Sequence, residues 1–461
     1  MKLKTLGLLL GPILAVAFWL ICLSAGLPAP AARVAGLTAL CAVWWILEPI
    51  PIPVTSLLPF ALLPLLGITD HEKVARAYGH HLILLLLGGF ILSGAMEKSG
   101  VHRRLALGMV RVVGTRGPRL VMGFMLAATL ISMWISNTAT ALMLLPVAIA
   151  LVQQAEDERL AMPLLLAVAY GANIGGVGSP VGTPPNLIFL AQYEAATGQH
   201  FGFLNWMKIG VPVSLLLAPL AAMWLSRGVR GCPPVRLPEL GPWRKAEGRV
   251  LAVFALTALL WITRAEPAGG WQAFVADYWG YKGELIGDST VALAMVALMF
   301  LLPDGEGERL LDWKTAEELP WGILLLFGGG IAIADAFSST GLSAAIGQGL
   351  APLAAWPPVL TVFALTFVTV FLTEVTSNTA LATLLMPILA GAAAGAGVKP
   401  ELFMVPATLA ASLGFMMPVG TAPNAIVFGT KRVTMQQMVR EGFAINLMAI
   451  GVTTLVCALL L

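Results

Sequence analysis

Apolar and polar positions alternate along this chain in long blocks, and the apolar blocks predict membrane-spanning helices. Short polar connections separate one block from the next. Because a helix needs about 20 apolar residues to cross a bilayer, a block of about that length predicts one span. We place the apolar blocks at residues 6–26, 34–48, 54–68, 82–99, 120–152, 162–190, 208–226, 249–263, 286–302, 321–338, 357–393, 402–428 and 442–461.

Two of these blocks, 120–152 and 357–393, are too long for one ordinary span, and each carries a polar Ser-Asn-Thr sequence near its middle. Polar, non-helical backbone is tolerated at membrane depth only where it is buried in protein or faces a watery cavity. Each block therefore predicts a re-entrant hairpin, in which two half-helices meet at a polar tip.

Three motifs occur twice in the same order, which predicts a chain built from two repeats. The matching pairs are LLLLGG at 84–89 with LLLFGG at 324–329, SNTATALMLLP at 136–146 with SNTALATLLMP at 377–387, and PVGTPPN at 180–186 with PVGTAPN at 418–424. Their spacing predicts an extra N-terminal helix (1–33), a first repeat (34–230), a cytoplasmic linker (231–248) and a second repeat (249–461).

The distribution of basic residues predicts that the two repeats have opposite orientations in the membrane. If each hairpin enters and leaves on one side, each repeat crosses the membrane five times, and an odd number inverts the second repeat. Short cytoplasmic loops hold the excess of Lys and Arg. With the N-terminus in the cytoplasm, 20 of the 27 basic residues lie inside. The seven outer ones are Arg33, Lys73, Arg76, Lys208, Arg264, Lys282 and Lys399.

Composition supports one membrane-embedded body. The 461 residues are 58% hydrophobic and 11% charged, where a soluble protein has about 25% charged residues. The formal charge of +3 is scattered among apolar runs, so no nucleic-acid surface is indicated. The apolar run at 6–25 is longer than the core of a cleaved signal, about 7–15 residues, and predicts an uncleaved first helix. We predict an all-α polytopic membrane protein with eleven spans and two re-entrant hairpins, arranged as two inverted-topology repeats.

The polar tips predict an anion site. In each Ser-Asn-Thr tip, Asn or Thr is expected to cap the apolar helix that follows. In the Gly-Thr-Pro-Pro-Asn and Gly-Thr-Ala-Pro-Asn motifs, Thr is expected to be the cap and Pro to begin the restarted helix. Four half-helix N-termini would then face one region, where unpaired N–H groups and the helix dipole favour a negative charge.

The half-helices that precede these tips predict cation sites beside the anion. They end near 132–136, 178–182, 373–377 and 416–420 and would leave unpaired carbonyl groups there. Carbonyl oxygens with Ser, Thr and Asn oxygens suit a hard monovalent cation such as Na⁺. The pattern occurs in both repeats, so it predicts one anion site with a cation site on each flank.

Other residue types add little chemistry. No Lys or Arg lies in the middle of an apolar block near the tips, so we expect amides, hydroxyls and dipoles to hold the anion. The five histidines lie in loops or at span ends, the four cysteines are far apart, and no hydrolase or metalloprotease motif is present. An enzyme is therefore not indicated. Glu374 lies just before the second tip, and two roles stay open for it: structural hydrogen bonding or cation coupling.

The paired Ser-Asn-Thr tips, the two Gly-Thr-x-Pro-Asn breaks and the sequence Glu48-Pro49-Ile50-Pro51 resemble the divalent anion:sodium symporters, in particular their dicarboxylate-transporting group. The resemblance covers essentially the whole chain. It implies a homodimer in the plasma membrane, with the N-terminus in the cytoplasm, whose scaffold carries two transport domains that move as elevators. It also implies two or more coupling Na⁺ ions and succinate, malate or fumarate as substrate.

The resemblance also implies roles for individual residues. The first Na⁺ would be bound by Ser132, Ser136, Asn137 and Gly182. The second would be bound by Thr373, Asn378, Gly420 and the carbonyl of Thr376. The dicarboxylate would contact Asn137, Thr138, Thr183, Asn378, Thr379 and Thr421.

Alternatives stay open at this level. Some members of the family exchange dicarboxylates without sodium, and others carry citrate or sulfate. A passive anion channel and a membrane-embedded enzyme are the alternatives from other classes.

Overall fold

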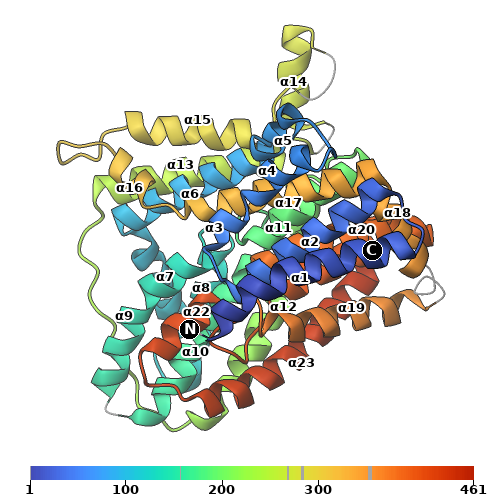
Figure 1. The fold of residues 1–461 in the computed structure, drawn as a ribbon. Helices are drawn as coiled ribbons and strands as arrows, with labels where there is room; N and C mark the ends of the chain where they lie inside the picture. Colours follow the sequence, from blue (N-terminus) through green and yellow to red (C-terminus); the bar gives the residue numbers. More distant parts are fainter. Residues whose placement is uncertain (1, 156, 267–268, 282–284, 351–355) are drawn as a thin grey trace.

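The structure is a computed structural model that describes residues 2–155, 157–266, 269–281, 285–350 and 356–461. Within these ranges, the regular elements are helices, and the β-structure is limited to two isolated bridges. The all-α prediction is confirmed. Figure 1 shows the helices packed into one body, from which α14 stands away.

The first part of the chain forms twelve α-helices and two short 3-10 helices, η1 and η2. They are α1 (Lys2–Ser24), α2 (Ala29–Leu47), α3 (Ile52–Thr55), α4 (Leu58–Leu65), α5 (His71–Tyr78), α6 (His81–Ser99), α7 (Val101–Val113), α8 (Gly117–Ser132), α9 (Asn137–Ala155), η1 (Glu158–Leu160), α10 (Ala161–Gly176), α11 (Pro184–Thr197), α12 (Phe203–Leu225) and η2 (Ser226–Gly228).

The rest of the chain forms eleven α-helices, and α17 to α23 follow the same order as α6 to α12. LLLLGG and LLLFGG lie in α6 and α17, and each later motif lies at a corresponding break between helices. The helices are α13 (Lys245–Thr263), α14 (Gly270–Trp279), α15 (Asp288–Leu301), α16 (Trp313–Glu317), α17 (Trp321–Thr340), α18 (Leu342–Leu350), α19 (Pro358–Thr373), α20 (Asn378–Ala396), α21 (Pro400–Ala411), α22 (Ala422–Gly429) and α23 (Met435–Leu460).

The described residues include nine helices that are long and apolar enough to cross a membrane. Seven of the eleven predicted spans correspond to such helices: α1, α2, α6, α12, α13, α17 and α23. The predicted spans near 54–68 and 286–302 are shorter apolar helices, and those near 162–190 and 402–428 are broken at their Gly-Thr motifs. A polytopic membrane protein is confirmed. Lys282, used in the count of outer basic residues, lies outside the described residues.

Packing brings the broken helices of the two halves together. Helix α8 packs on α10, and α19 packs on α21 in the corresponding way. Across the halves, α10 packs on α22 and α11 on α20, and the rings of Tyr170 and Phe415 meet edge to face at 5.1 Å. All four breaks are thereby placed around one region.

Candidate functional site

The four breaks surround one cavity of about 460 Å³. Its wall includes both Ser-Asn-Thr tips and both Gly-Thr segments. Phe90 and Glu97 of α6 and Glu318, which follows α16, are among the other residues that line it. All six residues expected to contact the anion line the cavity: Asn137, Thr138, Thr183, Asn378, Thr379 and Thr421. The structure therefore brings together residues up to 284 positions apart in the sequence.

Serine, and not Asn or Thr, precedes the first helical residue at each tip. Ser136 Oγ accepts a hydrogen bond of 3.3 Å from the Ala139 N–H, whereas Ser377 is the N-cap residue of α20 without a side-chain hydrogen bond to the helix. The expectation that Asn or Thr would cap these helices is wrong. With Ser in that position, Asn137 and Asn378 begin their helices, and their amides turn back toward the preceding half-helix.

Each tip asparagine pairs with a hydroxyl at the end of the preceding half-helix. The Ser132 hydroxyl donates to Asn137 Oδ1 at 2.9 Å, and the Thr373 hydroxyl donates to Asn378 Oδ1 at 2.7 Å. Thr373 Oγ also lies 2.6 Å from the Ala411 carbonyl oxygen. Ser132 and Thr373 are fully buried, so these oxygens gather behind the cavity wall.

Further oxygens converge on Asn137. The amide atom of Asn137 that faces Ser132 Oγ also lies 3.1 Å from the Ala172 carbonyl oxygen and 3.3 Å from that of Gly182. As nitrogen, this atom donates to both carbonyl groups. As oxygen, it joins them and Ser132 Oγ in a cluster of acceptors, which is the environment that a hard cation takes.

Glycine is required at position 182 because backbone carbonyl groups of neighbouring segments lie close to its Cα. A Cβ at this position would lie 2.5 Å from the Gly176 carbonyl oxygen and 3.0 Å from those of Ser132 and Met133. At Gly420, a Cβ would lie 3.2 Å from the Thr373 carbonyl oxygen. Backbone oxygens thus surround both glycines, as expected beside the tips.

The remaining predicted cation ligands lie at the tips themselves. Ser136 lines the cavity, whereas the Thr376 hydroxyl donates back to the Leu372 carbonyl at 2.8 Å. The predicted ligand at Thr376 is its carbonyl group, which this hydrogen bond leaves available.

The asparagine that ends each Gly-Thr motif holds its break closed, a role that the sequence analysis did not assign. Asn186 Nδ2 donates to the carbonyls of Gly176 and Ser179 at 2.9 and 2.7 Å. Asn424 Nδ2 donates to the carbonyls of Gly414 and Met417 at 3.2 Å each. These acceptors occupy matching positions in the two halves. The repetition of Asn in both motifs was the sequence signal for this role.

Asn173 makes the two halves different. This fully buried residue of α10 donates from Nδ2 to Thr421 Oγ at 2.9 Å and to Asn424 Oδ1 at 3.2 Å. Its counterpart in the second half is Ala411, so the first break receives no matching bond. Within the described residues, the Oδ1 atoms of Asn173 and Asn186 lack a hydrogen-bond partner. No sequence motif marked Asn173.

Glu374 anchors the second break. Its Oε1 accepts from the backbone N–H groups of Phe415 and Met416 at 2.7 and 2.9 Å, and its Oε2 accepts from Met417 N–H at 2.8 Å. Asn446 Nδ2 of α23 donates to Oε1 at 2.7 Å. Glu374 is 3% exposed, and four donors satisfy its carboxylate. Of its two possible roles, structural hydrogen bonding and cation coupling, the geometry supports structural hydrogen bonding.

Comparisons with known proteins match this chain to transporters. Residues 42–404 match the family model described as citrate transporter. The sodium-dependent dicarboxylate transporter SdcS of Staphylococcus saprophyticus is 39% identical over 98% of this chain and 90% of the relative. SdcS of Staphylococcus aureus is 38% identical over the same shares.

One solved structure has a similar fold. The YdaH transporter of Alcanivorax borkumensis gives a TM-score of 0.63, with 94% of this chain and 98% of that chain covered. Its sequence identity is 16%, so this likeness concerns the fold alone.

Proposed function

This chain belongs to the divalent anion:sodium symporter family, and from that premise we propose that it carries C4-dicarboxylates such as succinate, malate and fumarate together with Na⁺. Membership is established by the family match over 42–404 and by the relatives at 38–39% identity. The family consists of transporters and not of enzymes. The SdcS relatives are named as sodium-dependent dicarboxylate transporters, which supports Na⁺-coupled dicarboxylate transport by this chain.

The observation that carries the proposal is the cavity wall built from both halves. Asn-Thr pairs face the cavity from the start of α9 and of α20, and Thr183 and Thr421 face it at the start of α11 and α22. Backbone N–H groups and dipoles at helix N-termini favour anions. Two such groups of donors suit an anion with a carboxylate at each end.

Na⁺ coupling is supported by the oxygens behind that wall. In the first half, Ser132, Asn137 and Gly182 contribute them. In the second half, Thr373 and Asn378 contribute them beside Gly420. Ser136 and the Thr376 carbonyl complete the two proposed ligand sets. Bound Na⁺ would offset the negative charge of the substrate, so each ligand would bind better in the presence of the other.

An elevator motion of a homodimer in the plasma membrane is the proposed mechanism, and the packing supports a division into two parts. Helix α12 packs on α8, α10 and α23, and α23 packs on α19 and α21. A second group forms where α6 packs on α13 and α15 and where α17 packs on α2, α4 and α5. We propose that the first group moves with the substrate and that the second is the scaffold.

The test is uptake of labelled succinate into proteoliposomes that contain the purified protein. We expect accumulation with an inward Na⁺ gradient and a loss of most uptake when choline replaces Na⁺. Full accumulation without Na⁺ and without internal dicarboxylate would contradict symport. Uptake that needs internal dicarboxylate and ignores Na⁺ would indicate the exchanger.

Two substrate alternatives are measured in the same assay. The family description names citrate, so citrate is the competitor to test first, followed by sulfate. Uptake that only equilibrates succinate with its gradient would indicate the passive channel instead.

A further inference from the structure

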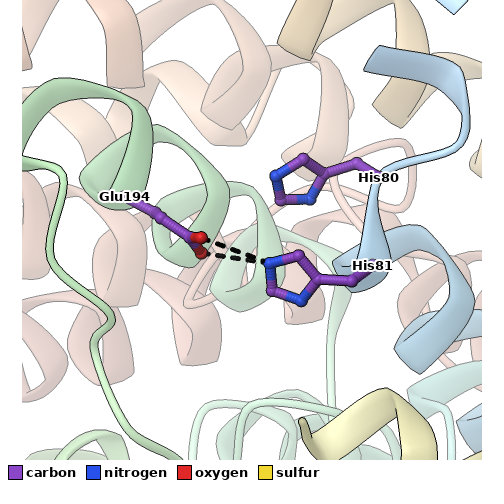
Figure 2. Close-up of side chains that lie close together, drawn as sticks. All are labelled: His80, His81 and Glu194. Carbon is purple, nitrogen blue, oxygen red and sulfur yellow. Dashed lines mark hydrogen bonds and ion pairs between the residues drawn. The ribbon is translucent and has the colours of Figure 1, made fainter. Parts of the chain in front are cut away.

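Outside the cavity, three metal-binding side chains converge where α6 begins and α11 ends. His80 and His81 come from the start of α6, and Glu194 comes from the last turn of α11. One ligand atom from each lies within 4.8 Å of the other two. Figure 2 shows both imidazole rings and the carboxylate facing a common space.

The distances fit a single metal ion. His81 Nε2 lies 3.3 and 3.2 Å from the two Glu194 carboxylate oxygens, and the ring centroids of His80 and His81 are 4.4 Å apart. Ligands of tetrahedral Zn²⁺, at about 2.0–2.1 Å from the ion, are about 3.4 Å from each other. The His81–Glu194 pair already has this separation. A ligand atom of His80 lies within 4.8 Å of both, so the His80 side chain would have to turn further to become the third ligand.

Neighbouring groups orient the carboxylate. His200 Nδ1 lies 3.5 Å from Glu194 Oε2, which leaves Oε1 to face the ion. The positive charge of Arg264 nearby is balanced by Asp288, whose Oδ1 accepts from Arg264 Nε at 2.5 Å. Such outer partners fix the geometry of metal ligands and raise affinity. The His81 and Glu194 side chains are 40% and 32% exposed, so an ion can reach them.

We propose that His80, His81 and Glu194 form a binding site for a divalent transition-metal ion such as Zn²⁺, which clamps α11 to α6. Two imidazoles and one carboxylate, with a fourth position open to water, are a donor set that Zn²⁺ takes in proteins.

The proposed clamp would affect transport because both helices extend to the cavity. Helix α11 starts at the cavity beside Thr183, and α6 carries Phe90 and Glu97 of the cavity wall. Helix α11 packs on α21 of the group proposed to move, and we count α11 with that group, whereas α6 belongs to the proposed scaffold. This step therefore rests on the proposed function. An ion bound by both groups stabilises this arrangement over any in which the ligands separate, and it slows transport.

Metal binding is tested first, because it does not depend on transport. Purified full-length protein is stripped with chelator and titrated with ZnCl₂ by calorimetry, and its thermal unfolding is followed with and without Zn²⁺. We expect one site per chain, with affinity lower by about 100-fold or more in His80→Ala, His81→Ala and Glu194→Gln, because loss of a ligand costs more than loss of an outer partner. The matched control is His71→Ala, because His71 is an exposed histidine outside the cluster. Wild-type protein that binds no Zn²⁺, or cluster variants that bind it as wild type does, would overturn the site.

Transport is then measured in proteoliposomes with Zn²⁺ or with chelator on both sides. We expect Zn²⁺ to slow succinate uptake by wild type and by His71→Ala and to leave the three cluster variants unaffected. Uptake in chelator shows that each variant is folded. Site-specific Zn²⁺ binding with undiminished uptake would overturn the clamp, whereas absence of uptake by wild type in chelator would contradict the proposed function and not the metal site.

Discussion

At the scale of single residues, Thr183 and Thr421 occupy corresponding positions in the two halves but differ in their side-chain hydrogen bonds. Thr421 Oγ accepts from Asn173 Nδ2 at 2.9 Å and from the Asn424 N–H at 3.3 Å. Both lone pairs of this oxygen are then used, and its proton is left to donate into the cavity. Thr183 caps α11 without a side-chain hydrogen bond. We infer that Thr421 is the stronger anion donor.

This inference predicts the effect of Asn173→Asp. The new carboxylate accepts the Thr421 proton and turns it away from the anion, at a cost of about 1–2 kcal/mol, so the KM for succinate should rise about 5- to 30-fold. Uptake kinetics are compared with those of Asn173→Ala, with thermal unfolding as the control for folding. In a Thr421→Val background, Asn173→Asp should raise KM little further. An equal rise in both backgrounds would show that Asn173 does not act through Thr421.

The tip asparagines should be individually essential. Asn137→Ala and Asn378→Ala each remove an amide that faces both the cavity and the oxygens behind it. The loss of a buried polar partner costs about 1–3 kcal/mol, and here it affects substrate and Na⁺ together. We expect both purified variants to stay folded and to lose transport. Wild-type uptake by either one would remove that tip from the site.

At the scale of elements, the breaks at the two Gly-Thr motifs are stabilised by one shared interaction and by a second that only one of them has. Asn186 and Asn424 hold both breaks in the same way. The second break also rests on Glu374, whose counterpart Met133 offers only its carbonyl, which accepts from the Ser179 hydroxyl. A carboxylate is tolerated in the membrane because three backbone N–H groups and Asn446 satisfy it.

Removal of that anchor should destabilise the second break. Glu374→Ala leaves the backbone N–H groups of Met416 and Met417 without their acceptor, each at about 1–3 kcal/mol, whereas the Phe415 N–H keeps Asn446 Oδ1 at 3.1 Å. We expect a clearly lower Tm in detergent and little uptake, with Glu374→Gln intermediate because its amide oxygen still accepts. Glu97→Gln is the matched control, since Glu97 is an exposed carboxylate of the cavity wall. An unchanged Tm in Glu374→Ala would refute the anchor.

At the scale of the whole molecule, the proposed motion predicts which cross-links block transport. A Cβ at Gly89 of α6 would lie 3.6 Å from Val181 Cβ, within the range of about 3.5–4.5 Å that a disulfide needs. In a background without the four native cysteines, the Gly89→Cys/Val181→Cys pair should stop uptake when oxidised and recover on reduction. The control pair, Gly7→Cys/Pro49→Cys, joins α1 to the turn after α2 at 3.4 Å, just below that range, and should transport in both states. Equal uptake by the oxidised test pair would contradict the elevator.

Substrate choice is also a property of the whole molecule, because residues of both halves line the cavity and each half is proposed to supply donors for one end of the anion. Each dipole-and-amide contact contributes about 0.3–2 kcal/mol, so a single end binds weakly. Succinate, fumarate and malate should compete for uptake, and butyrate, which satisfies only one half, should not. Competition by butyrate equal to that by succinate would show that the anion is not held at both ends.

Much of the architecture and of the cavity wall could be predicted from the sequence. Long apolar blocks require helices in a membrane, because backbone polar groups there must be bonded internally. The repeated Ser-Asn-Thr and Gly-Thr motifs break those helices locally, through capping residues and proline, wherever they occur. The family resemblance that these motifs carry named the six residues proposed to contact the anion, and all six line the cavity.

Only the tertiary structure decided which residues hold the breaks and where the halves differ. Glu374 meets Phe415 and Asn446 across 41 and 72 positions, and Asn173 reaches Thr421 across 248. His81 and Glu194 are 113 positions apart and carry no shared motif. Such contacts depend on how helices pack, which a local pattern of residues does not encode. The sequence thus determined the helices and their breaks, and packing determined the partners of each polar group, because a buried polar atom is satisfied by whatever lies beside it in space.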